Sequence, residues 1–270
     1  MRRLSFLSFI LFLAVVPVSA ANLVVVVTDG PGVGFNDPTP TTPVGGNMGT
    51  TLGAQRLIVF QEAARIWGGL LPSNVSIKIN SSFQKLDCDP TTAVLGSAGT
   101  ATIFADFANA PVANTWYPKA LADKLAGSEI DSSGNAINAR FNSDLGLPAP
   151  AGTSKTGCFT GFPFYLGLDS NQGSNVNLLS VVLHEFGHGL GFQSFTNSSG
   201  TFQQGVPGIF ERNLFDATSG KTWDQMVDTD RVFSAINTGN LRWNGSHAAV
   251  YANANMSGRA RLLVAAPAAV

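Results

Sequence analysis

The chain opens with a hydrophobic segment whose pattern differs from everything after it. Arg2 and Arg3 carry positive charge, a largely apolar run extends from Leu4 to Val16, and Val18-Ser19-Ala20 provides the small residues of a cleavage site. This is the layout of a secretory signal peptide, and the run is too short to cross a bilayer, which takes about 20 apolar residues. We therefore expect residues 1–20 to be removed near Ala20 and the mature chain to be secreted, either to the extracellular medium or to the periplasm.

The next part of the chain alternates strand-like and helix-like patterns. Three runs have the β-branched or alternating pattern of strands: Asn22–Thr28, Val75–Asn80 and Ile137–Asn142. Leu52–Trp67 predicts an amphipathic helix that ends at Gly68-Gly69. The other expected elements are a strand and turn over 93–104, a helix over 118–126 that begins at its proline, an extended segment over 162–168, and loops over 29–53 and 148–157.

After Phe192 the pattern becomes irregular. Residues 195–225 predict mostly loop with one short helix over 209–215, followed by a helix over 228–236 and a strand over 259–264. We therefore predict an α+β fold in which a twisted mixed sheet with long helices precedes a smaller, irregular C-terminal subdomain. Residues 21–192 and 193–270 would be the two halves of a single catalytic domain, 21–270, with a substrate cleft between them.

Composition narrows the possible partners. Charged residues make up 12% of the chain and the net charge is −1, whereas about 25% charged residues is typical. This balance gives no electrostatic basis for binding nucleic acid or an anionic membrane, and no later run is long enough to span a bilayer. In an exported chain, Cys88 and Cys158 predict a disulfide; the alternative is that one of them ligates or blocks a metal.

The segment with the most specific chemistry is His184-Glu185-x-x-His188, at the end of a helical run that Ser174 or Asn175 would cap. Residues four apart lie on the same face of a helix, so both imidazoles can share one metal ion. Glu185 lies about 100° further round and can act on a water without binding the metal. The chain has only 3 histidines, and apolar flanking residues predict a buried helix, in which unpaired polar groups are costly. We interpret the histidines as Zn²⁺ ligands and Glu185 as the catalytic base.

This segment resembles the zincin metallopeptidases, and specifically their metzincin branch, whose motif is His-Glu-x-x-His-x-x-Gly-x-x-His. His184, Glu185, His188 and Gly191 match that motif in order, while Ser194 stands where its third histidine would be. The predicted order of strand, long helix, strands and motif helix is also similar to that of metzincins. The resemblance implies a metzincin-like fold that holds Zn²⁺.

The third ligand has several candidates. Gly-x-Gly-Phe after His188 resembles leishmanolysin-like metzincins, in which an insertion precedes the third histidine and a Met-bearing turn follows it. That resemblance makes His247 the third ligand and Met256 the turn residue beneath the zinc. Two alternatives stay open: a carboxylate ligand, Asp216 or Glu211, or no third ligand in this chain, which would then be a truncated form of a longer protein.

Together these features predict a secreted zinc endopeptidase that cleaves protein or peptide substrates. Glu185 would take a proton from the attacking water and pass it to the leaving amine, and Tyr165, Tyr251 or His247 could stabilise the oxyanion. The competing prediction is a catalytically incomplete, zincin-like secreted protein that acts as a binding or scaffold module. A glycosidase would need two facing carboxylates, and acidic residues are sparse.

Overall fold

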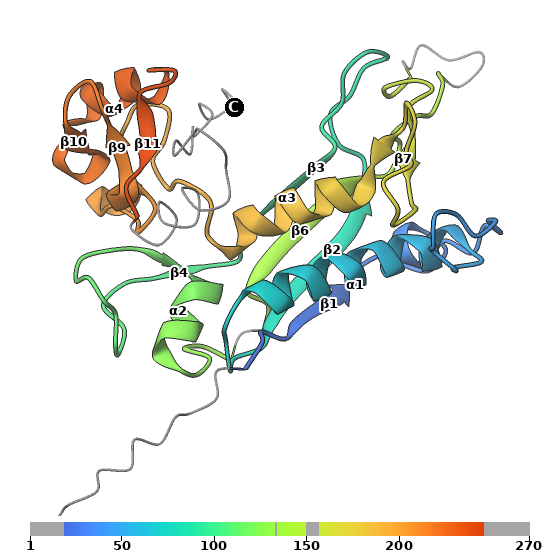
Figure 1. Cartoon of the computed structure of the whole chain (residues 1–270), viewed down its shortest axis with the longest axis horizontal. Coiled ribbons are helices and arrows are strands. Elements are labelled where there is room, and N and C mark those ends of the chain that lie inside the picture. Colours follow the sequence, from blue (N-terminus) through green and yellow to red (C-terminus); the bar gives the residue numbers. More distant parts are fainter. Residues whose placement is uncertain (1–18, 133, 150–156, 246–270) are drawn as a thin grey trace, which may run out of the picture.

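The computed structural model describes residues 19–132, 134–149 and 157–245, and they form a mixed α+β fold (Figure 1). Its centre is a four-stranded sheet with the strand order β1-β2-β6-β3. The strands are β1 (Leu23–Val27), β2 (Ile77–Gln84), β6 (Ile137–Asn142) and β3 (Gly96–Thr100). β1, β2 and β6 are parallel, and β3 is antiparallel to β6 at the edge. The predicted α+β class and mixed sheet are confirmed.

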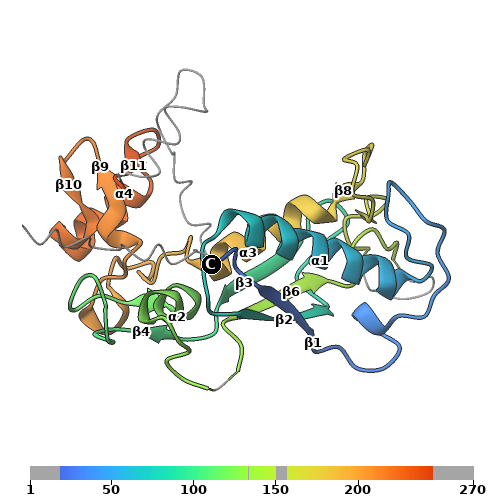
Figure 2. The same cartoon turned by 60° about the horizontal axis from the view of Figure 1, so that its bottom comes forward.

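Two long helices, α1 (Leu52–Leu70) and α3 (Leu178–Leu190), lie side by side on one face of this sheet (Figure 2). Phe60 of α1 lies at their common centre, with ring centroids 4.7 Å from Phe141 of β6 and 5.9 Å from Phe186 of α3. All three rings are fully buried. Within the described part of the chain, no helix is both long and apolar enough to cross a membrane.

The end of α1 differs from the prediction. The helix continues through Gly68 and Gly69 to Leu70. A Cβ at Gly68 would lie 2.5 Å from the Ala21 carbonyl oxygen, and the Ala21 N–H donates to the Gly68 carbonyl at 3.1 Å. Gly68 is therefore needed where the helix approaches the start of β1, and it does not terminate the helix. β2 likewise extends beyond its predicted end, because its pairing with β6 continues to Gln84 opposite Asn142.

The start of the motif helix also differs. α3 begins at Leu178, and Asn177 caps it by accepting a hydrogen bond from the Ser180 N–H at 3.0 Å. The predicted cap at Ser174 or Asn175 is wrong because those residues lie in a turn, closed by the Asn175 N–H donating to the Gln172 carbonyl, and a short strand follows them before the helix. Val176–Asn177 form β8, which pairs in parallel with β7 (Phe164–Tyr165) before the helix begins.

Replacing Asn177 with Ala is expected to lower the free energy of unfolding by about 1 kcal/mol, the usual cost of losing an N-cap. Asn175→Ala is the matched control, because the structure assigns that side chain no capping bond, and it should change stability by less than about 0.5 kcal/mol. Urea unfolding followed by circular dichroism measures both. Equal losses in the two variants would contradict the assignment of the cap.

The shorter elements between β3 and β6 surround a buried lysine. They are β4 (Ile103–Phe104), β5 (Tyr117–Pro118) and α2 (Lys119–Ala126). Lys119 is 1% exposed, and its ammonium lies 3.0 Å from the Asp123 carboxylate and 2.9 Å from that of Asp131. This paired charge joins the first turn of α2 to the segment that leads into β6.

The C-terminal part has more regular structure than the sequence predicts. Its strands are β9 (Leu214–Asp216), β10 (Lys221–Thr222) and β11 (Leu241–Trp243), and its helix is α4 (Asp228–Ala235). It also has the 3₁₀ turns Gln203–Gly205, Glu211–Asn213 and Trp223–Gln225. In the N-terminal part, one more 3₁₀ turn, Gly34–Asn36, follows β1. Of the short helix predicted over 209–215, only the 3₁₀ turn Glu211–Asn213 forms, because β9 takes up residues 214–216 by pairing with both β10 and β11. A separate small core underlies this sheet: Phe210, Leu214, Trp223, Met226 and Leu241. The strand predicted over 259–264 lies outside the described residues.

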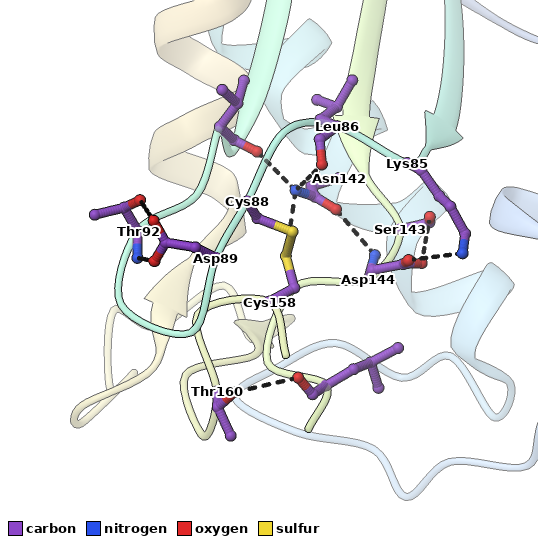
Figure 3. Close-up of a disulfide and its surroundings, with 12 residues drawn as sticks. Lys85, Leu86, Cys88, Asp89, Thr92, Asn142, Ser143, Asp144, Cys158 and Thr160 are labelled. Carbon is purple, nitrogen blue, oxygen red and sulfur yellow. Dashed lines mark hydrogen bonds and ion pairs between the residues drawn. A yellow bond between two sulfur atoms is a disulfide. The ribbon is translucent and has the colours of Figure 1, made fainter. Parts of the chain in front are cut away.

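The predicted disulfide is confirmed. Cys88 and Cys158 are bonded across a separation of 70 residues, linking the loop after β2 to the loop after β6 (Figure 3). Asn142, at the end of β6, is fully buried beside the bond and donates to the Val94 carbonyl at 2.9 Å. No cysteine of the described chain is free, so neither sulfur serves as a metal ligand.

Candidate metal centre

The helix that carries the motif is buried on one side only. Glu185, Phe186 and Gly189 are buried against the sheet, whereas His184 is exposed and His188 is half-buried. The expectation that the whole motif is buried is therefore wrong. The two histidines lie on the open side of α3, where an ion and a substrate can reach them.

The two imidazoles converge on one point. His184 Nε2 and His188 Nε2 are 3.0 Å apart, and the rings meet edge to face with their centroids 4.6 Å apart. Two nitrogens that bind one tetrahedral zinc at 2.0–2.1 Å would be separated by about 3.3 Å. The side chains thus need only a small adjustment to share an ion.

A backbone carbonyl fixes the tautomer of His188. His188 Nδ1 lies 2.7 Å from the carbonyl oxygen of Phe192. Because a carbonyl only accepts hydrogen bonds, Nδ1 must carry the hydrogen, and the lone pair of the neutral ring is on Nε2. That nitrogen is the one that faces His184. Such a bond from the distal ring nitrogen is the usual support for a metal-binding histidine.

The turn after α3 places this carbonyl. Gly191 has a φ of 132°, a conformation that residues other than glycine rarely adopt, and the Phe192 N–H donates to the Gly187 carbonyl at 3.0 Å. The Phe192 ring packs against Phe210, with centroids 5.0 Å apart. Phe192 therefore joins the histidine pair to the core of the C-terminal part.

Glu185 is held by the edge strand of the sheet. Its side chain reaches β3, where Oε2 accepts a hydrogen bond from the Ala98 N–H at 2.8 Å, and the residue is 9% exposed. Gly96 makes room for it, because a Cβ there would lie 3.2 Å from Glu185 Cγ and 2.8 Å from the Phe141 ring. The carboxylate thus has a defined position between α3 and β3.

Replacing Gly96 with Ala should move Glu185 without touching the histidines. A misplacement of about 1 Å in a reacting group can lower a rate about 100-fold, so we expect a comparable fall in kcat for peptide hydrolysis with unchanged zinc content. Gly99→Ala is the matched control on the same strand, because the added Cβ meets only the end of the Gln193 side chain. Unaltered kcat in Gly96→Ala would show that this position of Glu185 does not matter.

Glu211, a candidate third ligand, instead supports the turn that follows the motif. It is fully buried, and its Oε1 accepts hydrogen bonds from Ser194 Oγ at 2.9 Å, the Phe195 N–H at 2.5 Å and Thr196 Oγ1 at 3.1 Å. Ser194, at the position of the motif's missing histidine, is therefore bonded to this carboxylate. The arrangement orients the chain between α3 and the C-terminal part.

The other candidates are also placed away from the histidine pair or fall outside the described chain. Asp216 accepts hydrogen bonds from the N–H groups of Thr218 and Ser219; burial alone would raise its pKa, but its hydrogen bonds hold the pKa below the usual value. Among the described residues, no three His, Cys, Asp or Glu side chains form a group that could hold a metal. His247, Met256 and Tyr251 lie outside those residues.

Tyr165, a possible oxyanion donor, is engaged elsewhere. Its hydroxyl donates to Asp169 at 2.6 Å, and that hydrogen bond raises the pKa of the phenol. Sequence reasoning did not identify the groups that do support the motif, namely the Phe192 carbonyl and the Ala98 N–H. Both are backbone groups, so residue type carries no signal for them. For the Phe192 carbonyl, the sequence carries one indirect signal: Gly191 predicts a turn at the end of the helix.

Comparison with known protein families, curated proteins and solved structures finds no match to this chain.

Proposed function

We propose that the chain is a secreted zinc-dependent endopeptidase. The observation that carries the proposal is the convergence of His184 Nε2 and His188 Nε2, 3.0 Å apart, with the Phe192 carbonyl fixing the His188 tautomer. His184 and His188 would hold Zn²⁺, and His247 is our proposed third ligand, since a catalytic zinc usually has three protein ligands.

The proposed reaction is hydrolysis of a peptide bond. The chemistry that Zn²⁺ supplies when bound is Lewis acidity, which polarises a carbonyl group and lowers the pKa of a water to about 7. Glu185 accepts the proton of the attacking water and then delivers it to the leaving amine. The Ala98 N–H donates to this carboxylate at 2.8 Å and so holds it in place between α3 and β3.

The edge of the sheet supports a peptide as the substrate. Asn142 donates its N–H to the Leu95 carbonyl, and Ala101 donates to Ala136, so the odd-numbered residues of this segment are bonded to β6. The backbone groups of Gly96, Ala98 and Thr100 therefore point away from β6, beside Glu185. An extended peptide can add to such an edge by main-chain hydrogen bonds, which would bring its carbonyl groups close to the base.

The order of elements supports a metzincin-like catalytic domain. A strand (β1), a long helix (α1), further strands and then the motif helix (α3) follow one another along the chain, as the resemblance implied. In the proposed domain, 21–270, the C-terminal part would form one wall of the cleft and supply His247 as the third ligand, with Met256 following it in the sequence.

One observation favours a second function. Within residues 19–132, 134–149 and 157–245, only two side chains converge as candidate ligands. If His247 does not complete the site, the protein would be a catalytically incomplete, zincin-like binding or scaffold module.

Chelation tests the proposed function. The chain secreted after removal of residues 1–20 should hydrolyse a denatured protein substrate, lose that activity in a chelator that removes zinc, and regain it when Zn²⁺ is returned. Hydrolysis that survives removal of the metal would contradict the proposal. Absence of hydrolysis in a zinc-loaded protein would favour the binding function.

A further inference from the structure

The outer side of β1 has no partner strand in the described part of the chain. The Ile77 N–H donates to the Asn22 carbonyl, and the Thr28 N–H donates to the Ser81 carbonyl. Successive residues of a strand direct their backbone groups to opposite sides, so the even-numbered residues of 22–28 are bonded to β2. The N–H and C=O groups that point away from the sheet belong to Leu23, Val25 and Val27.

This edge lacks the features by which proteins usually prevent strand addition. Edge strands are commonly protected by lysines, prolines or bulges, whereas β1 reads Leu-Val-Val-Val-Val and keeps regular pairing with β2 throughout. Val24 is 38% exposed. A long apolar strand edge of this kind is a site where another strand can pair.

A groove follows the same edge. It has a volume of about 630 Å³ and lies between residues 20–25 and the side of α1 that carries Gln61, Arg65 and Gly69. A strand added beside β1 would occupy this groove and contact α1 as well as the edge.

We propose that this surface, the outer edge of β1 with the adjoining side of α1, binds the same surface of a second copy of the chain. The two β1 strands pair antiparallel about a two-fold axis at Val24, so that Leu23 of each copy is opposite Val25 of the other. Two four-stranded sheets then become one continuous sheet. A two-fold interface must be self-complementary, and a uniform, uncharged valine strand meets that requirement.

The helices favour a second copy over an unrelated segment. α1 and α3 together cover four strands, and strands about 4.8 Å apart give a helix spacing of about 10 Å, close to the 8–10 Å of packed helices. Continuing the sheet across the axis places the two α1 helices at that same spacing. Arg65 is 71% exposed and bonded to Glu62 at 2.6 Å, so in an antiparallel helix pair each Arg65 can also face Glu62 of the other copy.

The first test is the mass of the secreted chain in solution, measured by sedimentation equilibrium at micromolar concentration. We expect a dimer. Val25→Pro should halve the mass and leave the circular dichroism spectrum unchanged, because it removes an outward N–H that β2 does not use. A monomeric wild-type chain would overturn the proposal.

Two further variants fix the register and the helix contact even if Val25→Pro fails to fold. Val24→Cys should form an intermolecular disulfide on oxidation, whereas in Val26→Cys the two thiols would be about 14 Å apart and should not react. Glu62→Arg should weaken the dimer and the double change with Arg65→Glu should restore it. Cross-linking through position 26 instead, or no rescue by the charge exchange, would contradict this geometry. None of these results depends on the proposed peptidase activity.

Discussion

Replacing Glu185 with Gln should lower kcat for peptide hydrolysis by about 100- to 10,000-fold, the usual contribution of general acid–base catalysis. An amide oxygen can still accept the hydrogen bond that Glu185 receives from the Ala98 N–H at 2.8 Å, but the amide cannot take a proton from water. Fold and zinc content should therefore stay unchanged. Initial rates on a quenched fluorescent peptide, with metal content measured on the same sample, check both parts.

Glu129→Gln is the control for this experiment. Glu129 forms an exposed ion pair with Lys78 at 3.2 Å, and exposed pairs of this kind contribute at most about 1 kcal/mol to stability. Its replacement should leave kcat unchanged. If Glu185→Gln retained most of the wild-type rate, Glu185 would not be the base and the mechanism would have to be abandoned.

Removing the disulfide should have the largest effect on stability. The bond between Cys88 and Cys158 closes a loop of 70 residues, for which chain entropy predicts a loss of about 4 kcal/mol in the free energy of unfolding when both cysteines become serine. Urea unfolding of the double variant beside the wild type measures this loss. A decrease below about 1 kcal/mol would show that the loops are held by other contacts, such as the hydrogen bonds of Asn142.

The variant in which Cys88 and Cys158 are both serine also tests whether the disulfide supports the candidate metal centre. The loop that contains Cys88 leads into β3, whose Ala98 N–H holds Glu185. We therefore expect the double variant to lose activity at a lower urea concentration than the wild type, in parallel with its unfolding. A loss of activity well before unfolding would mean that the disulfide orders β3 locally.

The regular elements of the N-terminal part could be predicted because each has a clear period. Ile137–Asn142 alternates apolar and polar residues along the sequence and is β6 without any change of boundary. The cap of α3 could not be chosen from sequence, because Ser174, Asn175 and Asn177 are all good capping residues. The pairing of β8 with β7 decides among them. That pairing joins segments separated in the sequence, and no local pattern reports it.

The C-terminal part was predicted less well for a related reason. β9, β10 and β11 have only two or three residues each, too few to show a period, and they exist because they pair with one another around Trp223 and its neighbours. The histidine pair followed from its spacing on a helix. The role of Glu211 did not follow from the sequence. An acidic residue near a metal motif has the same sequence signature whether it binds the metal or supports the backbone. In this structure Glu211 accepts three hydrogen bonds from the chain after α3.

The most direct test of the account is the zinc content per chain after dialysis against a mild chelator, measured by elemental mass spectrometry on the secreted protein and on His184→Ala, His188→Ala and His247→Ala. We expect about one zinc per chain in the wild type and almost none in any of the three variants. A wild-type ratio near zero, or a ratio that does not change when His184 or His188 is replaced, would contradict the assignment of this pair as a zinc site.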